Sequence, residues 1–243
     1  MEEEPAQRLS PWPDGGPEHP ERPNPPGMRL QAEVSLWSAD LANLAAAIRR
    51  VEPLADSFHL DVSDGRFTPN LLFFPDLVRA LRPHTNLPFH VHLMVERPTT
   101  LISDFVAAGA DTITVHLESG EAEAAASIEA IHGAGRSAGL ALRLETPVAA
   151  VQPYLGRIEC MLLLGTEPGV KGHDLAPQAC ARLAEARRML GGGSGRVRLV
   201  ADGGIRRHTV PLLRRAGADV VVPGSLVFQS ENLEDTFQRL RAV

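Results

Sequence analysis

The feature that most constrains the fold of this 243-residue chain is a regular alternation of short apolar runs with longer amphipathic segments. The apolar runs are rich in Val, Ile, Leu and Phe, as expected of strands that are covered on both faces. The amphipathic segments have the spacing of helices that bury one face. Strands are predicted at residues 34–37, 57–62, 89–94, 112–117, 138–144, 160–165, 198–201 and 220–222, and helices at residues 41–50, 75–81, 99–108, 121–133, 148–155, 177–190, 208–216 and 233–240.

Eight strand–helix pairs in succession predict the α/β class and, within it, a single-domain (β/α)8 TIM barrel. A doubly wound open sheet is the alternative. Such a sheet usually carries a glycine-rich fingerprint after its first strand, whereas this chain has Ser38, Ala39 and Asp40 there. The barrel is therefore the favoured prediction.

Residues 1–28 differ from the rest of the chain, because they are rich in proline and acidic residues and poor in apolar ones. Such a segment cannot bury enough surface to offset the entropy that is lost on ordering. We therefore predict a disordered extension at 1–28 and the barrel domain at 29–243. The acidic N-terminus is also unlike a signal peptide, which needs a basic region followed by an apolar one.

The charge of the chain bears on its partners and its compartment. A net charge of −6 argues against a nucleic-acid or anionic-membrane binder, which needs a basic face. No apolar run reaches the roughly 18 residues that a membrane helix requires. Two cysteines, Cys160 and Cys180, form no zinc or disulfide framework, so a reducing, cytoplasmic location is expected. A homo-oligomer is compatible with this architecture, although the sequence shows no interface.

Polar side chains gather where three of the predicted strands end. His59 and Asp61 lie two positions apart on the second strand, so they share one face. His92 lies near the end of the third strand, and Asp202 follows the seventh. One such residue alone would more often be an isolated polar group that is satisfied by backbone or water. Two imidazoles and two carboxylates at the same end of a barrel favour one divalent metal ion, either Zn²⁺, Fe²⁺, Mn²⁺ or Co²⁺.

Two further histidines, His90 and His116, also fall on predicted strands. They are either hydrogen-bond partners of the metal ligands or core histidines, and the residue pattern favours neither interpretation.

Glycine-rich turns follow the last two predicted strands. Gly203 and Gly204 come after the seventh strand, and Gly224 and Ser225 come after the eighth. Barrels hold phosphate groups with these two loops, and glycine lets the backbone approach the anion closely. Tight turns without a ligand are the alternative, but two adjacent turns of this kind favour a phosphate site.

A third glycine-containing loop follows the sixth predicted strand and carries Gly169, Lys171 and Gly172. We expect this loop to close over the same anion. Arginine supplies every other side chain of the Lys/Arg type in the chain, so Lys171 stands out. Its compact ammonium group would either contact the phosphate or remain a solvated loop residue.

A metal ion beside two carboxylates, with a phosphate site to one side, suits a small phosphorylated sugar. The metal would hold a carbonyl and a neighbouring hydroxyl and stabilise an enediolate, while the carboxylates move a proton on the adjacent carbon. Carboxylates on opposite faces of the substrate would produce epimerisation. The residue pattern leaves that facial arrangement open.

Several segments together resemble the ribulose-phosphate 3-epimerase family over nearly all of residues 30–230. They are 35–40 (Ser-Leu-Trp-Ser-Ala-Asp), 59–65 (His-Leu-Asp-Val-Ser-Asp-Gly), 92–94 (His-Leu-Met), 109–111 (Gly-Ala-Asp), 202–205 (Asp-Gly-Gly-Ile) and 224–225 (Gly-Ser). The resemblance implies a (β/α)8 barrel with one bound divalent metal. It also implies that His59, Asp61, His92 and Asp202 are the ligands, with Asp61 and Asp202 doubling as acid and base at C3.

The resemblance also implies which residues bind the substrate. Ser35 would contact it, Met94 would line the enediolate region together with His92, and residues 203–204 and 224–225 would hold the phosphate. The expected activity is 3-epimerisation of a ketose phosphate of the ribulose 5-phosphate/xylulose 5-phosphate type, a reaction of carbohydrate metabolism.

Two departures from the family pattern bear on the substrate. The family usually has methionine where this chain has Ser63 and Leu164, and its loop Asn-Pro-Gly-Phe-Gly-Gly-Gln reads Glu-Pro-Gly-Val-Lys-Gly-His at 167–173. Allulose 6-phosphate or a tetrulose phosphate is therefore an alternative substrate, and a non-catalytic phosphosugar-binding barrel is an alternative function. A Schiff-base aldolase that uses Lys171 is disfavoured, because such a lysine should sit desolvated at a strand end.

Overall fold

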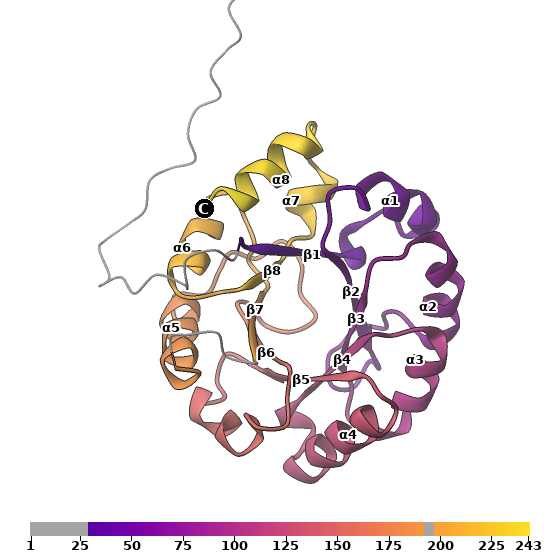
Figure 1. Ribbon diagram of the computed structural model, residues 1–243, viewed down its shortest axis with the longest axis vertical. Helices are drawn as coiled ribbons and strands as arrows, with labels where there is room; N and C mark the ends of the chain where they lie inside the picture. The colour runs from indigo at the N-terminus through magenta and orange to yellow at the C-terminus, as the bar shows by residue number, and fades with distance from the viewer. Residues whose placement is uncertain (1–28, 192–196) are drawn as a thin grey trace, which may run out of the picture.

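The computed structural model describes residues 29–191 and 197–243, and the predicted extension at 1–28 lies outside them. Eight parallel strands form a closed barrel in chain order, which confirms the predicted fold (Figure 1). The strands are β1 Gln31–Ser35, β2 Ser57–Ser63, β3 Phe89–Met94, β4 Thr112–His116, β5 Ser137–Leu142, β6 Cys160–Leu164, β7 Arg198–Asp202 and β8 Val220–Val222.

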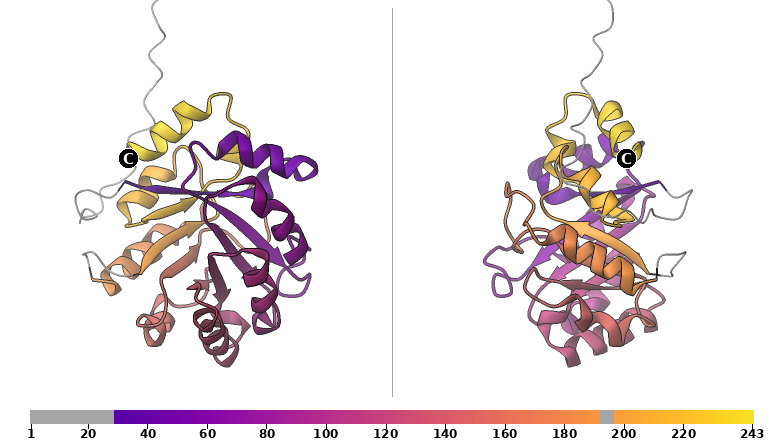
Figure 2. Two further views of the ribbon diagram at one scale, coloured as in Figure 1. Left: turned by 45° about the vertical axis from the view of Figure 1, so that its right-hand side comes forward. Right: turned by 90° about the vertical axis from the view of Figure 1, so that its left-hand side faces the viewer.

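Helices lie on the outside of the strands, as Figures 1 and 2 show from three directions. The α-helices are α1 Leu44–Val51, α2 Pro75–Leu81, α3 Ile102–Ala108, α4 Glu121–Gly133, α5 Ala179–Met189, α6 Val210–Arg215, α7 Ser225–Phe228 and α8 Leu233–Arg241. Short 3-10 helices complete the connections: η1 Leu36–Ser38, η2 Leu41–Asn43, η3 Arg82–His84, η4 Pro98–Thr100, η5 Leu117–Ser119 and η6 Val148–Tyr154.

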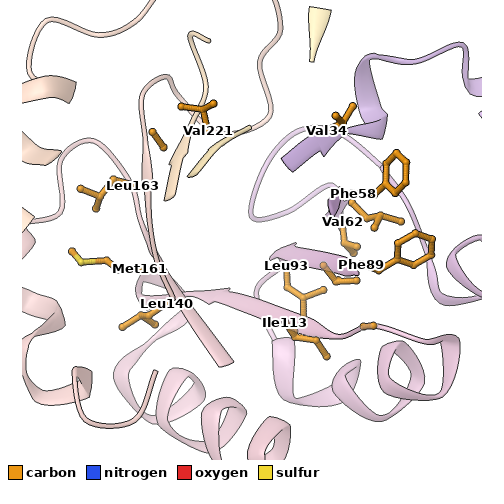
Figure 3. Close-up of a cluster of buried hydrophobic side chains, with 14 of the residues drawn as sticks. Val34, Phe58, Val62, Phe89, Leu93, Ile113, Leu140, Met161, Leu163 and Val221 are labelled. Atoms are coloured by element: carbon orange, nitrogen blue, oxygen red, sulfur yellow. The ribbon is translucent and has the colours of Figure 1, made fainter. Parts of the chain in front are cut away.

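The hydrophobic core lies largely between the strands and the helices. Apolar side chains on the outer faces of neighbouring strands, among them Phe58 and Phe89, are fully buried there (Figure 3). The rings of Phe58 and Phe89 meet edge to face at 6.2 Å between centroids. Burying such a side chain contributes roughly 1.5–3 kcal/mol, so this layer is a major source of stability.

Successive side chains of a strand point to opposite faces, so every second side chain points into the barrel. On β2, Phe58 points outward, so the next residues of opposite parity, His59 and Asp61, point inward. The register pairs Asp61 with His92 on β3, which places their side chains next to one another. The barrel therefore delivers polar side chains from several strands to one end.

Two predicted elements are wrong in detail. The strand predicted at 34–37 begins earlier, at Gln31, where it pairs with Val220 of β8, and it ends at Ser35, where the chain turns into η1. The helix predicted at 148–155 is the 3-10 helix η6, because Pro153 within it lacks the amide hydrogen that an α-helix needs.

Other differences are small. The short helix α7 was not predicted, because its four residues are too few to show a period. The predicted helices at 41–50 and 99–108 each begin with a separate 3-10 turn, η2 and η4 respectively. Across residues 29–191 and 197–243, no helix is both long enough and apolar enough to span a membrane.

Candidate active site

The floor of the candidate site consists of the four side chains that the sequence pattern singled out. β2 contributes His59 and Asp61, β3 contributes His92, and β7 ends in Asp202. The Nε2 atom of His59 lies 3.3 Å from His92 Nδ1, 3.3 Å from Asp61 Oδ1 and 3.7 Å from Asp202 Oδ2. His92 Nδ1 lies 3.3 Å from Asp61 Oδ1 and 3.6 Å from Asp202 Oδ2.

These separations fit a metal ion. Four ligands that each lie about 2.0–2.1 Å from the centre of a tetrahedron are about 3.3 Å apart. Two imidazole nitrogens and two carboxylate oxygens are donors that first-row divalent cations accept. All four donor atoms lie within 4.8 Å of one another, so one ion would reach the whole set.

A hydrogen-bond chain behind His92 determines which of its nitrogens faces the cluster. His92 Nε2 lies 2.9 Å from His116 Nε2, and His116 Nδ1 lies 2.9 Å from Glu118 Oε2. The carboxylate of Glu118 can only accept, so Nδ1 of His116 carries the proton; burial lowers the pKa of His116 to about 4 and keeps it neutral. His116 Nε2 therefore accepts from His92 Nε2, and Nδ1 of His92 is the nitrogen that faces the cluster and would bind a metal ion.

The two candidate ligand carboxylates differ in their affinity for a proton. Burial and the neighbouring Asp61 carboxylate raise the pKa of Asp202 to about 6. Burial also opposes ionisation of Asp61, but the imidazoles of His59 and His92 outweigh it and hold the Asp61 pKa well below its usual range. Ser35 donates a further hydrogen bond to Asp61 Oδ2 at 3.0 Å.

A cavity of 810 Å³ opens above this floor. Every residue predicted to bind the substrate lines the cavity except His92, which is fully buried beneath it. The lining members of the predicted set are Ser35, Met94, Gly169, Lys171, Gly172, Gly203, Gly204, Gly224 and Ser225. Loops that are far apart in the chain therefore contribute these residues to one cavity.

Packing also requires the glycines of the predicted phosphate loops. Gly203 and Gly204 have φ angles of 90° and 69°, which disfavour any larger residue. A Cβ atom on Gly204 would lie 2.6 Å from the backbone of Leu175, and one on Gly224 would lie 2.3 Å from Ser38 Oγ. Close approach of neighbouring loops thus accounts for these glycines independently of any anion.

Lys171 reaches across the mouth of the cavity toward β1. Its ammonium group donates to the carbonyl oxygen of Trp37 at 2.5 Å and lies 4.4 Å from the centroid of the Trp37 ring. The contact joins the loop between β6 and α5 to η1. The amine is on an exposed loop rather than at a strand end, an arrangement that does not favour Schiff-base chemistry.

Arg206 is a lining residue that sequence reasoning missed, although it directly follows the Asp-Gly-Gly-Ile segment. Its guanidinium donates to the carbonyl oxygens of Ile205 at 3.0 Å and His173 at 3.2 Å. It also lies 3.4 Å from Ser225 Oγ. Arg206 therefore joins the loops that follow β6, β7 and β8 at the rim of the cavity.

Ser63, where the resembling family usually has methionine, ties a neighbouring loop in place. Its hydroxyl donates to the carbonyl oxygen of Asn70 at 2.8 Å and contacts the hydroxyl of Thr68. The Asn70 amide in turn donates to the carbonyl oxygen of Gly169. Ser63 thus holds the β2–α2 loop, and Asn70 joins this loop to the one that carries Lys171.

Fold and site together define a (β/α)8-barrel protein with a candidate divalent-metal centre beneath a polar cavity. The model of the ribulose-phosphate 3 epimerase family matches residues 31–228. The chain belongs to this family of isomerases, which confirms the resemblance and the predicted enzyme class.

Curated relatives carry the same name across distant organisms. The chain is 42% identical to the ribulose-phosphate 3-epimerase of Treponema pallidum over 195 residues, which cover 80% of this chain and 89% of the relative. It is 35% identical to the Bacillus subtilis enzyme of that name over 214 residues, or 87% and 98% of the two chains. The chloroplastic ribulose-5-phosphate-3-epimerase of Arabidopsis thaliana is 32% identical over 210 residues, or 86% and 75%.

Solved structures with lower identity show the fold alone. A crystal structure of KGPDC from Streptococcus mutans in complex with D-R5P superposes with a TM-score of 0.66 at 14% identity, covering 88% of this chain and 96% of that one. A 3-hexulose-6-phosphate synthase gives a TM-score of 0.64 at 18% identity, covering 88% and 99%.

Proposed function

We propose that the protein interconverts ribulose 5-phosphate and xylulose 5-phosphate by moving a proton on and off C3. The observation that carries this proposal is the pairing of Asp61 and Asp202 in one metal-type donor cluster beneath a single cavity. The names of the curated relatives support the same reaction.

In this proposal both carboxylates take part in the proton transfer. Asp61 and Asp202 come from strands on different sides of the barrel and both line the cavity, so a sugar carbon held between them would present one face to each. One carboxylate would remove the C3 proton, and the other would return a proton to the opposite face. A divalent ion bound by His59, Asp61, His92 and Asp202 would supply Lewis-acid stabilisation of the negative charge that develops on the oxygens at C2 and C3.

The phosphate of the substrate would occupy the rim beside β7 and β8. Residues 203–204 and 224–225 line this part of the cavity, and their backbone N–H groups would bind the phosphate as in other barrel phosphate sites. Arg206 adds a permanent positive charge there, and a guanidinium matches phosphate geometry.

We expect replacement of Arg206 by glutamine to raise KM for the ketose phosphate by about 10-fold or more with a smaller change in kcat, because a charge-assisted hydrogen bond to phosphate would be lost. Steady-state kinetics, together with competitive inhibition by inorganic phosphate, measures this. Arg215→Gln on the outer helix α6 removes the same charge from an exposed position and serves as the control. An unchanged KM and inhibition constant in Arg206→Gln would place Arg206 outside the phosphate site.

The alternative substrates remain allulose 6-phosphate and a tetrulose phosphate, because this chain has Ser63 and Leu164 where the family usually has methionine, and Leu164 lines the cavity. A comparison of kcat/KM for the three ketose phosphates, with protein of measured metal content, tests the proposal. We expect ribulose 5-phosphate to be preferred. A higher kcat/KM for another ketose phosphate would reassign the substrate, and no turnover of any of them would favour a non-catalytic phosphosugar-binding barrel.

A further inference from the structure

A buried glutamate lies beneath the candidate metal cluster, on the first strand. Glu33 is on the inward face of β1, two residues before Ser35, and only 1% of it is exposed. Isolated burial of a carboxylate inside a barrel is strongly unfavourable unless hydrogen-bond donors compensate it. The partners of Glu33 therefore indicate what it does.

Those partners are two imidazoles. Glu33 Oε2 lies 3.1 Å from His59 Nδ1 and 2.7 Å from His90 Nδ1. His90 Nε2 lies 2.6 Å from the hydroxyl of Thr114, which completes a buried chain across β1 to β4. Because the carboxylate accepts from both rings, each imidazole carries its proton on Nδ1. Nε2 of His59, the atom that faces Asp61 and His92, is then the nitrogen that would bind a metal ion.

We propose that Glu33 is a positioning residue that holds His59 in the tautomer and ring orientation required to bind the divalent ion. His90 anchors Glu33 from the other side and is itself no ligand. The inference rests on the proposed metal centre, and it assigns this centre an outer partner on β1. Glu118 is hydrogen-bonded to His116, which is hydrogen-bonded to His92. Each candidate histidine ligand is therefore connected to a carboxylate, His59 directly and His92 through His116.

A second metal ion within the same residues is the competing interpretation. Donor atoms of Glu33, His59 and His90 also lie within 4.8 Å of one another. However, the 2.7 Å separation of Glu33 Oε2 from His90 Nδ1 is a hydrogen-bond distance. Two ligands of one tetrahedral ion would be about 3.3 Å apart. The geometry therefore favours a hydrogen-bond network.

The test is Co²⁺ binding by protein that has been stripped of metal and reloaded, in the native chain and in Glu33→Gln. The glutamine preserves the size of the side chain but removes its charge, so it supports the ligand tautomer of His59 less strongly. We expect the native protein to bind one equivalent of Co²⁺ and the variant to bind it about 10- to 100-fold more weakly, the usual effect of losing an outer-shell partner. The visible absorption of the bound Co²⁺ should shift as the coordination changes.

Thr114→Val is the matched control, because it alters the same buried network at the end remote from His59. We expect its Co²⁺ affinity to stay within about twofold of native. If Glu33→Gln does not fold, Glu33→Met combined with His90→Leu replaces both buried partners by apolar groups, a change that is often tolerated. That double variant should fold and lose Co²⁺ affinity by at least the same factor.

The outcomes separate this inference from the proposed function. A native protein that binds no Co²⁺ would contradict the metal centre itself. One equivalent in the native protein, with the same affinity and spectrum in the Glu33 variants, would overturn the positioning role alone. Two equivalents in the native protein, one of them lost in Glu33→Gln, would show a second metal site and overturn the assignment of His90 as an anchor.

Discussion

Replacement of Asp202 by asparagine is expected to lower kcat for C3 epimerisation by about 10²- to 10⁴-fold, the contribution typical of a positioned general acid or base. The amide has nearly the same shape as the carboxylate but cannot accept or return the proton. Asp202 ends β7, and its Oδ2 atom lies within 3.7 Å of both candidate histidine ligands. The loss should therefore fall on turnover, with the fold preserved.

The measurement is steady-state turnover together with a thermal unfolding midpoint. Asp104→Asn, the same substitution at an exposed position of the outer helix α3, should leave both unchanged. Exchange of the substrate's C3 hydrogen with solvent deuterium distinguishes the roles of the two carboxylates. If Asp61 and Asp202 serve opposite faces, Asp202→Asn should still exchange the C3 hydrogen of one epimer, and Asp61→Asn that of the other. Full activity in Asp202→Asn would remove this residue from its role.

Removal of divalent metal is expected to reduce turnover by at least about 10³-fold, because charge that develops next to C3 would lose its Lewis-acid stabilisation. Chelation followed by elemental analysis establishes the metal-stripped state. Addition of Zn²⁺, Fe²⁺, Mn²⁺ or Co²⁺ in turn should restore activity and identify the ion that supports the highest rate.

His92→Ala provides the control for that experiment. The variant lacks one of four donors, so added metal should restore little of the activity at concentrations that saturate the native protein. Native turnover by protein with no measurable metal would contradict the metal centre and leave the cluster of His59, His92 and the two aspartates as a proton-transfer network alone.

The barrel and the four-residue floor could be predicted because both follow from local periodicity. Alternation within β2 places His59 and Asp61 on one face, and parallel strands bring their carboxyl ends to the same end of a barrel. This alternation and this strand polarity are local properties that do not depend on long-range contacts. The same logic placed His92 and Asp202 beside them.

The role of Glu33 could not be predicted in this way, because the start of its strand is set by pairing with β8 and not by the local sequence pattern. The apolar pattern favours a start at Val34, whereas the register joins Gln31 to Val220, far along the chain. From the sequence alone, a single glutamate just before a predicted strand is expected to be solvated. Its role becomes visible only when β2 and β3 bring His59 and His90 against it.

The contacts made by the loops at the cavity could not be predicted from local sequence patterns either. The partner of Lys171 is the carbonyl oxygen of Trp37, 134 residues earlier in the chain. Arg206 is held by contacts with the loops after β6 and β8, and the contacting residues, His173 and Ser225, are distant from position 206 in the sequence. Propensity describes such loops poorly, because tertiary contacts decide their conformation.

The central claim is that this chain moves a proton at C3 of a ketose phosphate, and hydrogen exchange tests it most directly. Metal-loaded protein incubated with ribulose 5-phosphate in D₂O should yield xylulose 5-phosphate with deuterium at C3, detected by NMR or mass spectrometry. Deuterium should also enter the recovered ribulose 5-phosphate as the reaction reverses. Absence of C3 exchange in ribulose 5-phosphate, allulose 6-phosphate and a tetrulose phosphate, with metal content confirmed, would contradict the claim.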